Sequence, residues 1–331
     1  MRIPKKKSPV YVPPKNAPNV ILQYRDRLIF RFIASYDRCL TDYQILFLLH
    51  READQLRIAG EVELAQEIET TSEALDVRLG KLAQAGYIHK LERWKREAFD
   101  YGIYWLTKQG AREHAGDEWK DHVFPNNPDF RQTEHDMAIV DFRLHVEQNV
   151  NKHDWLELVE WTNQSIFKED PDRVPFVKRN GKPDSRNMIP DGFCLIRDHR
   201  LEKRKRNGES REVRVFLELD MGTKDRNKMM DEKVIPGIAY IHSDVYKQRF
   251  GGAHGWWLYV CADEDTMMLL KRKTDLYVNQ KLKTDHKDYR NMFWFTHADY
   301  ITDDVLTAPI WYRSGRDNKQ FSLLNAAAGD Y

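Results

Sequence analysis

The pattern of apolar and polar residues predicts two neighbouring strands in the second half of the chain. In residues 211–223, alternating positions are taken by Val213, Val215, Leu217 and Leu219 on one side and by Arg214, Phe216, Glu218 and Asp220 on the other. A strand repeats every two residues, so Glu218 and Asp220 share one face. Residues 187–198 predict the partner strand, with Asp191 directly after a proline and a basic link between the two strands. A hairpin-like pairing would bring the three carboxylates to one edge.

Three carboxylates at one edge indicate a metal site. Asp191, Glu218 and Asp220 would repel one another strongly in a low-dielectric site, and a divalent cation or a lysine relieves such repulsion. Lys233 and Lys228 follow on a predicted helix. Acids that hold Mg²⁺ or Mn²⁺, with a lysine to offset developing charge, are the groups that phosphodiester hydrolysis needs. The alternative is that these acids are solvated residues at the ends of strands.

The other segments of the second half predict a mixed central sheet with helices. Counted from Phe130, the expected order is helix, three strands, helix, strand, helix, strand. Beyond the acidic pair, the strands are expected within 153–167, 254–263 and 291–301, a later helix within 264–282 and a charged loop at 168–186. His135 opens the first helix near its positive end, which makes it an outer candidate for the site. Its alternative role is a structural hydrogen bond.

Amphipathic helices and a two-stranded wing are predicted in the first half. Apolar residues recur at spacings of three and four in 28–36, 43–51 and 71–86, with Thr41 and either Thr71 or Ser72 as N-caps. Two strands follow, and this order is that of a winged helix-turn-helix.

Five basic residues of this region are the candidates for DNA contacts. Arg78 and Lys81, expected to be exposed on the third helix, would face the major groove, whereas Arg93, Lys95 and Arg96 of the wing would meet backbone phosphates. The alternative is a winged helix that makes protein contacts alone.

The acidic pair resembles a known nuclease motif. Pro190-Asp191 followed by Glu218-Leu219-Asp220 on the next strand looks like the PD-(D/E)xK nuclease-like fold. Active members of that fold have a lysine where Asp220 stands. The resemblance therefore implies either that Lys233 or Lys228 replaces that lysine or that catalysis has been lost.

A longer series of motifs is similar to the replication-relaxation family of bacterial mobile elements. The sequences HDMAIVDF (135–142), PDGF (190–193) and FLELDMGT (216–223), with Lys233 and Tyr240 downstream and a helix-turn-helix in front, occur in the order found in that family. The resemblance extends from about Asp26 to about Tyr300. It implies an α/β protein in which an N-terminal winged helix-turn-helix precedes a PD-(D/E)xK nuclease-like α/β domain with a mixed central sheet.

The sequence divides into five expected segments. They are a basic flexible tail (1–19), the winged helix-turn-helix (20–115), a linker rich in proline and asparagine (116–130), the nuclease-like domain (131–315) and a tail (316–331).

Composition indicates where the protein is found in the cell, but it does not indicate the function. The 331 residues are 41% hydrophobic, carry a net charge of +1, and contain three cysteines in no metal-binding spacing. No apolar run reaches the roughly 18 residues of a membrane span. We therefore expect a cytoplasmic protein without a membrane partner, whose positive charge is local.

The sequence is compatible with two main functions of different classes and with a third, less favoured one. The first is a plasmid or mobile-element protein that binds double-stranded DNA and nicks or cleaves it with Mg²⁺ or Mn²⁺. The second is a catalytically inactive accessory factor that binds DNA and recruits other proteins of replication, mobilisation or transposition. The third is a transcription regulator whose second domain senses a ligand.

Overall fold

The computed structural model describes residues 19–36, 38–91, 102–123, 130–201, 211–220, 229–252, 254–316 and 318–324. The chain forms two compact units, divided after Val140. No helix of the described part is long and apolar enough to cross a membrane.

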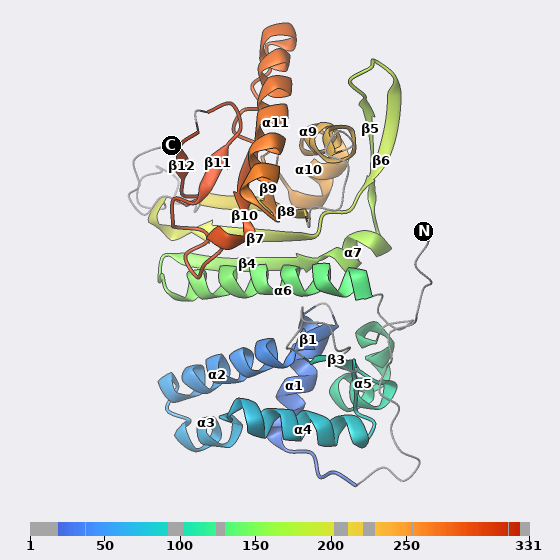
Figure 1. The fold of residues 1–331 in the computed structure, drawn as a ribbon, viewed down its shortest axis with the longest axis vertical. Helices are drawn as coiled ribbons and strands as arrows, with labels where there is room; N and C mark the ends of the chain where they lie inside the picture. Colours follow the sequence, from blue (N-terminus) through green and yellow to red (C-terminus); the bar gives the residue numbers. More distant parts are fainter. Residues whose placement is uncertain are drawn as a thin grey trace. The chain divides into compact units, whose positions relative to one another are not determined.

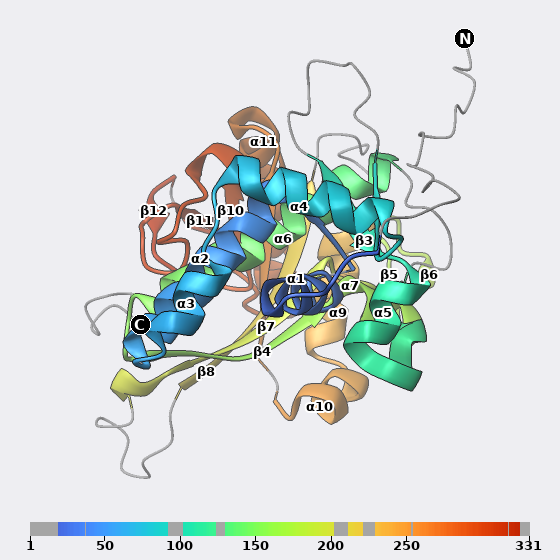
Figure 2. The ribbon, with the colours of Figure 1, turned by 90° about the horizontal axis from the view of Figure 1, so that it is seen from below.

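The first unit combines the helices α1 to α5, seen in Figure 2, with a small antiparallel sheet of order β1-β3-β2. Its elements are α1 (Tyr24–Ser35), β1 (Cys39–Thr41), α2 (Asp42–Ile58), α3 (Val62–Ile68), α4 (Ser72–Gln84), β2 (Ile88–Lys90), β3 (Ile103–Leu106), α5 (Lys108–Ala115) and a 3₁₀ helix, Gly116–His122. The predicted caps are confirmed: the Thr41 and Thr71 hydroxyls accept hydrogen bonds from the Gln44 and Ala74 backbone N–H groups. Residues 92–101, with Arg93, Lys95 and Arg96, lie outside the described residues.

The second unit is built on a seven-stranded mixed sheet of order β12-β11-β10-β9-β8-β7-β4 (Figure 1). The strands are β4 (Leu156–Asn163), β7 (Gly192–Asp198), β8 (Arg211–Asp220), β9 (Trp256–Cys261), β10 (Phe293–His297), β11 (Trp311–Arg313) and β12 (Gln320–Phe321). Strands β8, β9 and β10 are parallel, and β7 is antiparallel to β8. The predicted pairing of the two acidic strands is confirmed.

Helices cover both faces of this sheet (Figure 1). The helices α9 (Ile235–Ile241), α10 (Asp244–Phe250) and α11 (Glu264–Asp285) lie on one face. On the other face, Phe142 of α6 (Phe130–Asn151) contacts Trp161 of β4 and Trp311 of β11. The α6 helix begins five residues before His135, so the prediction that His135 opens the helix is wrong.

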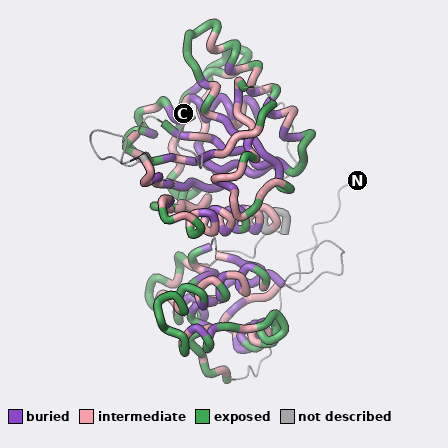
Figure 3. Tube along the Cα trace, turned by 90° about the vertical axis from the view of Figure 1, so that its left-hand side faces the viewer, coloured by how far each residue is buried: buried purple, intermediate pink, exposed green. Residues whose placement is uncertain are grey.

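The core between the sheet and α9, α10 and α11 is aromatic. Phe216 of β8 is fully buried and its ring lies 4.8 Å from Trp257, 5.0 Å from Phe193 and 5.7 Å from Tyr240, measured between ring centroids. Figure 3 shows the buried positions following the strands of the sheet. Because aromatic side chains bury a large area each, this cluster fixes the position of α9 against β8.

The predicted charged loop at 168–186 is instead part of an ordered hairpin. After the short helix α7 (Gln164–Glu169), β5 (Asp172–Val177) pairs antiparallel with β6 (Pro183–Met188) as a separate two-stranded sheet. Val174, Phe176 and Met188 are buried along one face. The other face is exposed. Asp172, Asp184 and Arg186 lie on the same face as the buried residues, and this hid the alternation in the sequence. The predicted acidic strand from residue 187 is shorter than expected, because β6 ends at Met188 and β7 begins at Gly192.

A π-helical turn, Met230–Val234, directly precedes α9. Pro236 lies in the first turn of α9, where its missing N–H costs nothing. The chain therefore changes from π-helical to α-helical geometry just before this proline. Wide π turns often occur at functional sites, and this one contains Lys233.

A candidate carboxylate and lysine site

The pairing of β7 with β8 brings Asp191 to the acidic end of β8. Asp191 directly precedes β7, and its backbone N–H donates to the Leu217 carbonyl oxygen at 2.9 Å. Because the strands are antiparallel, the start of β7 meets the end of β8, where Glu218 and Asp220 lie. The Asp191, Glu218 and Asp220 residues are each 3% exposed.

Asp191 is held in place through both carboxylate oxygens. Its Oδ2 accepts a hydrogen bond from the Leu219 backbone N–H at 2.7 Å, and its Oδ1 accepts one from Gln164 Nε2 at 2.6 Å. Gln164 is the first residue of α7 and was not predicted as a site residue. Nothing in the pattern around residue 164 marks it, because its position depends on the turn from β4 into α7.

Glu218 forms an ion pair with Lys233. The Lys233 Nζ lies 2.7 Å from Oε1 and 2.5 Å from Oε2 of Glu218, and the two side chains are 14% and 4% exposed. Burial lowers the pKa of Lys233, but Glu218 and Asp191 raise it more, so the net pKa lies above the usual value. The lysine is therefore a cation at neutral pH, close to both acids.

Asp220 takes the next position on the same face of β8 and pairs in register with Cys261 of β9. No group of three or more His, Cys, Asp or Glu side chains in the described ranges has the geometry to hold a metal ion. The three-ligand cluster suggested by the sequence is thus not found in this part of the chain. Asp191 and Glu218 remain as two buried carboxylates beside a lysine.

Tyr259 is a second residue of the site that the sequence analysis missed. It pairs in register with Glu218, is fully buried, and stacks on Phe295 with ring centroids 5.6 Å apart. Burial, followed by Glu218, Cys261 and Asp191, raises the pKa of Tyr259, so its hydroxyl stays protonated. Among the described residues this hydroxyl has no hydrogen-bond partner. The apolar run of β9 was recognised, but its register against β8 could not be read from the sequence.

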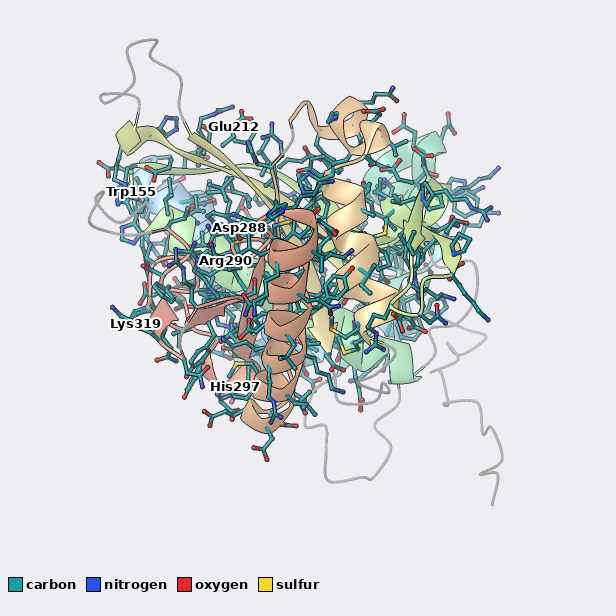
Figure 4. The ribbon with its side chains drawn as sticks, turned by 90° about the horizontal axis from the view of Figure 1, so that it is seen from above. Trp155, Glu212, Asp288, Arg290, His297 and Lys319 are labelled. Atoms are coloured by element: carbon teal, nitrogen blue, oxygen red, sulfur yellow. The ribbon has the colours of Figure 1, made fainter. Side chains whose placement is uncertain are left out.

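The same edge of the sheet extends to His297. His297 is 5% exposed and pairs in register with Cys261, so Asp220, Cys261 and His297 form one row across three parallel strands. In Figure 4, Glu212 and His297 mark opposite ends of these strands. Ligands of α/β proteins bind beyond the carboxyl ends of parallel strands, which is the end that His297 occupies.

The two predicted DNA contacts on α4, Arg78 and Lys81, differ in exposure. The expected exposure of Arg78 is wrong: its side chain is 16% exposed and its guanidinium bonds to the buried Asp26, with Nε 2.8 Å from Oδ1. It also donates to the Ile21 carbonyl oxygen at 2.9 Å. Lys81, on the same helix, is exposed as expected.

His135 and Lys228 were also predicted as residues of the carboxylate and lysine site. His135 belongs to the first unit, with its Nδ1 3.8 Å from Asp136 Oδ1. Lys228 lies outside the described residues.

Comparison with known protein families places this chain in a family. A family model for replication-relaxation proteins matches residues 37–255, which is more than half of the chain and includes Asp191, Glu218 and Lys233. Searches of curated proteins and of solved structures found no match. With these motifs in the expected order, the chain belongs to the replication-relaxation family.

Proposed function

We propose that this protein binds double-stranded DNA and nicks or cleaves it at the carboxylate and lysine site of the second unit. Membership of the replication-relaxation family links the chain to the replication or relaxation of plasmids or mobile elements. The observation that supports hydrolysis is the buried contact of Lys233 Nζ with Glu218, 2.7 Å from Oε1, next to a rigidly held Asp191.

The two acids would hold Mg²⁺ or Mn²⁺. Mg²⁺ in proteins commonly takes one or two carboxylates and keeps several waters, so a pair of acids suffices. Asp191 and Glu218 offer hard oxygen ligands of the kind that this ion prefers. When bound, the metal would supply a water of lowered pKa and neutralise charge on the phosphate. Because the three acids do not form a metal-holding cluster, Asp220 would orient the water and not act as a third ligand.

Active nucleases of this fold have a lysine at the position where this chain has Asp220. Lys233 would perform the role of that lysine. Its ammonium reaches Glu218 from the π turn instead of from β8. A buried ammonium stabilises negative charge on phosphate oxygens more strongly than a solvated one, because water screens it less. Lys228 is the second candidate for this role.

Binding of the duplex would involve the first unit as a winged helix. Lys81 is exposed on α4, and Arg93, Lys95 and Arg96 fall between β2 and β3, where the wing is expected. Arg78 would position α4 through Asp26 rather than contact a base.

A DNA-binding accessory factor without catalysis is the second candidate. It is favoured by the contact of Lys233 with both carboxylate oxygens of Glu218, which a metal would have to share or displace. Such a factor would recruit partners of replication, mobilisation or transposition.

Incubation of the purified protein with supercoiled plasmid and Mg²⁺ or Mn²⁺ distinguishes the two candidates. Nicking that is lost in Asp191→Asn and Glu218→Gln, while both variants keep the circular dichroism spectrum of the wild type, supports the enzyme. Intact plasmid together with a salt-sensitive gel shift supports the accessory factor. Nicking that both variants retain would reject this site as the catalytic centre.

A further inference from the structure

We propose that the β5–β6 hairpin is an arm that contacts the phosphates of duplex DNA next to the carboxylate and lysine site. This inference rests on the proposed function, because it assigns a second DNA contact to the same protein. In Figure 1 the hairpin stands beside α9 and extends away from the central sheet.

The two faces of the hairpin differ in chemistry. The register pairs Arg173 with Asn187, Pro175 with Ser185 and Val177 with Pro183, and these six residues form what we call the outer face. The opposite face contains the buried Val174, Phe176 and Met188, which belong to or border the core near α9. The outer face is therefore free of a packing role.

Positive charge is concentrated at the turn, and the outer face adds one base. The bases are Arg173 on the outer face, Lys178, Arg179 and Lys182 at the turn, and Arg186 on the opposite face, and no acid lies on the outer face. The acids of the hairpin, Asp172 and Asp184, are on the opposite face. Asp172 accepts a hydrogen bond from Tyr240 at 2.5 Å, and Asp184 forms an ion pair with Lys178 at 2.6 Å. A surface of this kind suits a polyanion.

The bases are available to a phosphate. Among the described residues Arg173 and Lys182 form no ion pair, and Arg173 donates to the Ser185 hydroxyl at 2.9 Å. Arg179 presents both its Nε and Nη2 to Asp231, at 3.1 and 3.0 Å, on the surface. Exposed ion pairs contribute only about 0–1 kcal/mol, so a phosphate can replace the carboxylate of Asp231. Arginine binds phosphate with the same two-pronged geometry.

The hairpin is joined to the site at its base. Asp231 and Glu232, which pair with Arg179 and Arg186 at 3.0 and 3.5 Å, directly precede Lys233 in the π turn. The chain that leaves β6 passes through Ile189, whose carbonyl oxygen lies 3.5 Å from Lys233 Nζ, to Asp191. DNA held by the arm would therefore lie along the element that carries Lys233. A two-stranded ribbon also has the width that the major groove admits.

The test replaces the two unpaired bases of the hairpin in the full-length protein. The variant Arg173→Gln/Lys182→Gln is compared with Lys247→Gln/Lys281→Gln, which removes two positive charges from α10 and α11. Binding of a labelled duplex of about 30 base pairs is measured across salt concentrations, since each phosphate contact contributes roughly 0.9 to the slope of log K against log salt. We expect the hairpin variant to lower this slope by about 2 and to weaken binding equally on unrelated sequences, whereas the control changes little.

Three results would contradict the proposal that the hairpin is a DNA-binding arm. If the hairpin and control variants have the same slope, with unchanged urea midpoints, the arm proposal fails while DNA binding stands. A loss confined to single-stranded DNA would also overturn it and assign the hairpin to single strands. A wild-type protein that binds no duplex would reject the proposed function together with the arm, so the two failures are distinguishable.

Discussion

At the scale of single residues, Lys233 determines the character of the candidate site. It brings a positive charge next to Glu218 in a place where water is largely excluded. Removal of one partner of a buried ion pair leaves a desolvated charge, whereas replacement of both partners by neutral groups is far less costly.

Lys233→Met should therefore lower the free energy of unfolding by about 3–5 kcal/mol. Adding Glu218→Gln to this variant should recover much of the loss, because the carboxylate that contacts Lys233 directly is then neutral as well. Urea denaturation of the two single variants and the double variant measures this coupling. Strictly additive losses would show that the two side chains do not interact.

The thiol of Cys194 should be inert in the folded protein. Burial raises the pKa of Cys194 from 9.0 to about 12. The neutral thiol thus stabilises the fold fully below pH 9, and this contribution is lost as the pH rises toward about 12. At pH 8.5, iodoacetamide should label Cys194 in urea but not in the native state. Equal labelling rates in both conditions would contradict the burial of this residue.

The principal site residues could be predicted from the sequence, whereas their neighbours could not. The period of two in β8 placed Glu218 and Asp220 on one face, and the partner strand located Asp191. Tyr259 and Gln164 reach the site through strand register and a turn, which no local pattern encodes. Arg78 was misplaced because a helical pattern cannot show a buried Asp26 on another helix.

At the scale of elements, the hairpin and α9 are joined by one hydrogen bond to a carboxylate. The Tyr240 hydroxyl on α9 donates to Asp172 on β5, which also pairs with Arg249 at 3.3 Å. This contact holds the base of the hairpin next to the π turn.

Tyr240→Phe should lower the free energy of unfolding by about 1.5–3 kcal/mol, the range for hydrogen bonds to charged groups. Tyr246→Phe is the matched control, because Tyr246 is equally buried and donates to a neutral acceptor, the His254 carbonyl oxygen. The Tyr246→Phe control should lower the free energy of unfolding by only about 0.5–1.5 kcal/mol. A greater loss in the control, measured by urea denaturation, would contradict this account of the hairpin.

Periodicity predicted five strands of the large sheet, but it predicted neither the hairpin nor the edge strands β11 and β12. The segment 316–331 was expected to be a tail, yet it contains β12. Pro175 and Pro183, with five bases nearby, gave residues 168–186 the composition of a loop. A two-stranded ribbon tolerates proline where its N–H group is not needed for pairing. Its buried face needs only Val174, Phe176 and Met188, too few residues to produce a clear apolar signal.

At the scale of the whole molecule, the chain divides into a predominantly helical first unit and a second unit built on a mixed sheet. The division after Val140 lies inside α6, later than the segment 116–130 that its prolines and asparagines suggested. Sequence composition marks irregular segments, but it cannot show that one helix takes part in two compact units. The net charge of +1 likewise gives no sign of where DNA would bind.

Lys81→Gln should weaken duplex binding if the first unit acts as a winged helix. Loss of one positive charge in the duplex interface should reduce the salt slope by up to about 1. Lys120→Gln, which removes a charge from another exposed lysine of the first unit, is the control and should leave the slope unchanged. Equal slopes for both variants would remove α4 from the DNA interface.

The central claim is that Glu218 and Lys233 serve chemistry and not stability alone. The most direct test is the rate of plasmid nicking, in Mg²⁺ or Mn²⁺, by Glu218→Gln/Lys233→Met, a variant in which both charges of this ion pair are removed together. We predict a folded protein, with a urea midpoint near that of the wild type, whose nicking falls to background. A folded double variant that nicks at the wild-type rate would contradict the account.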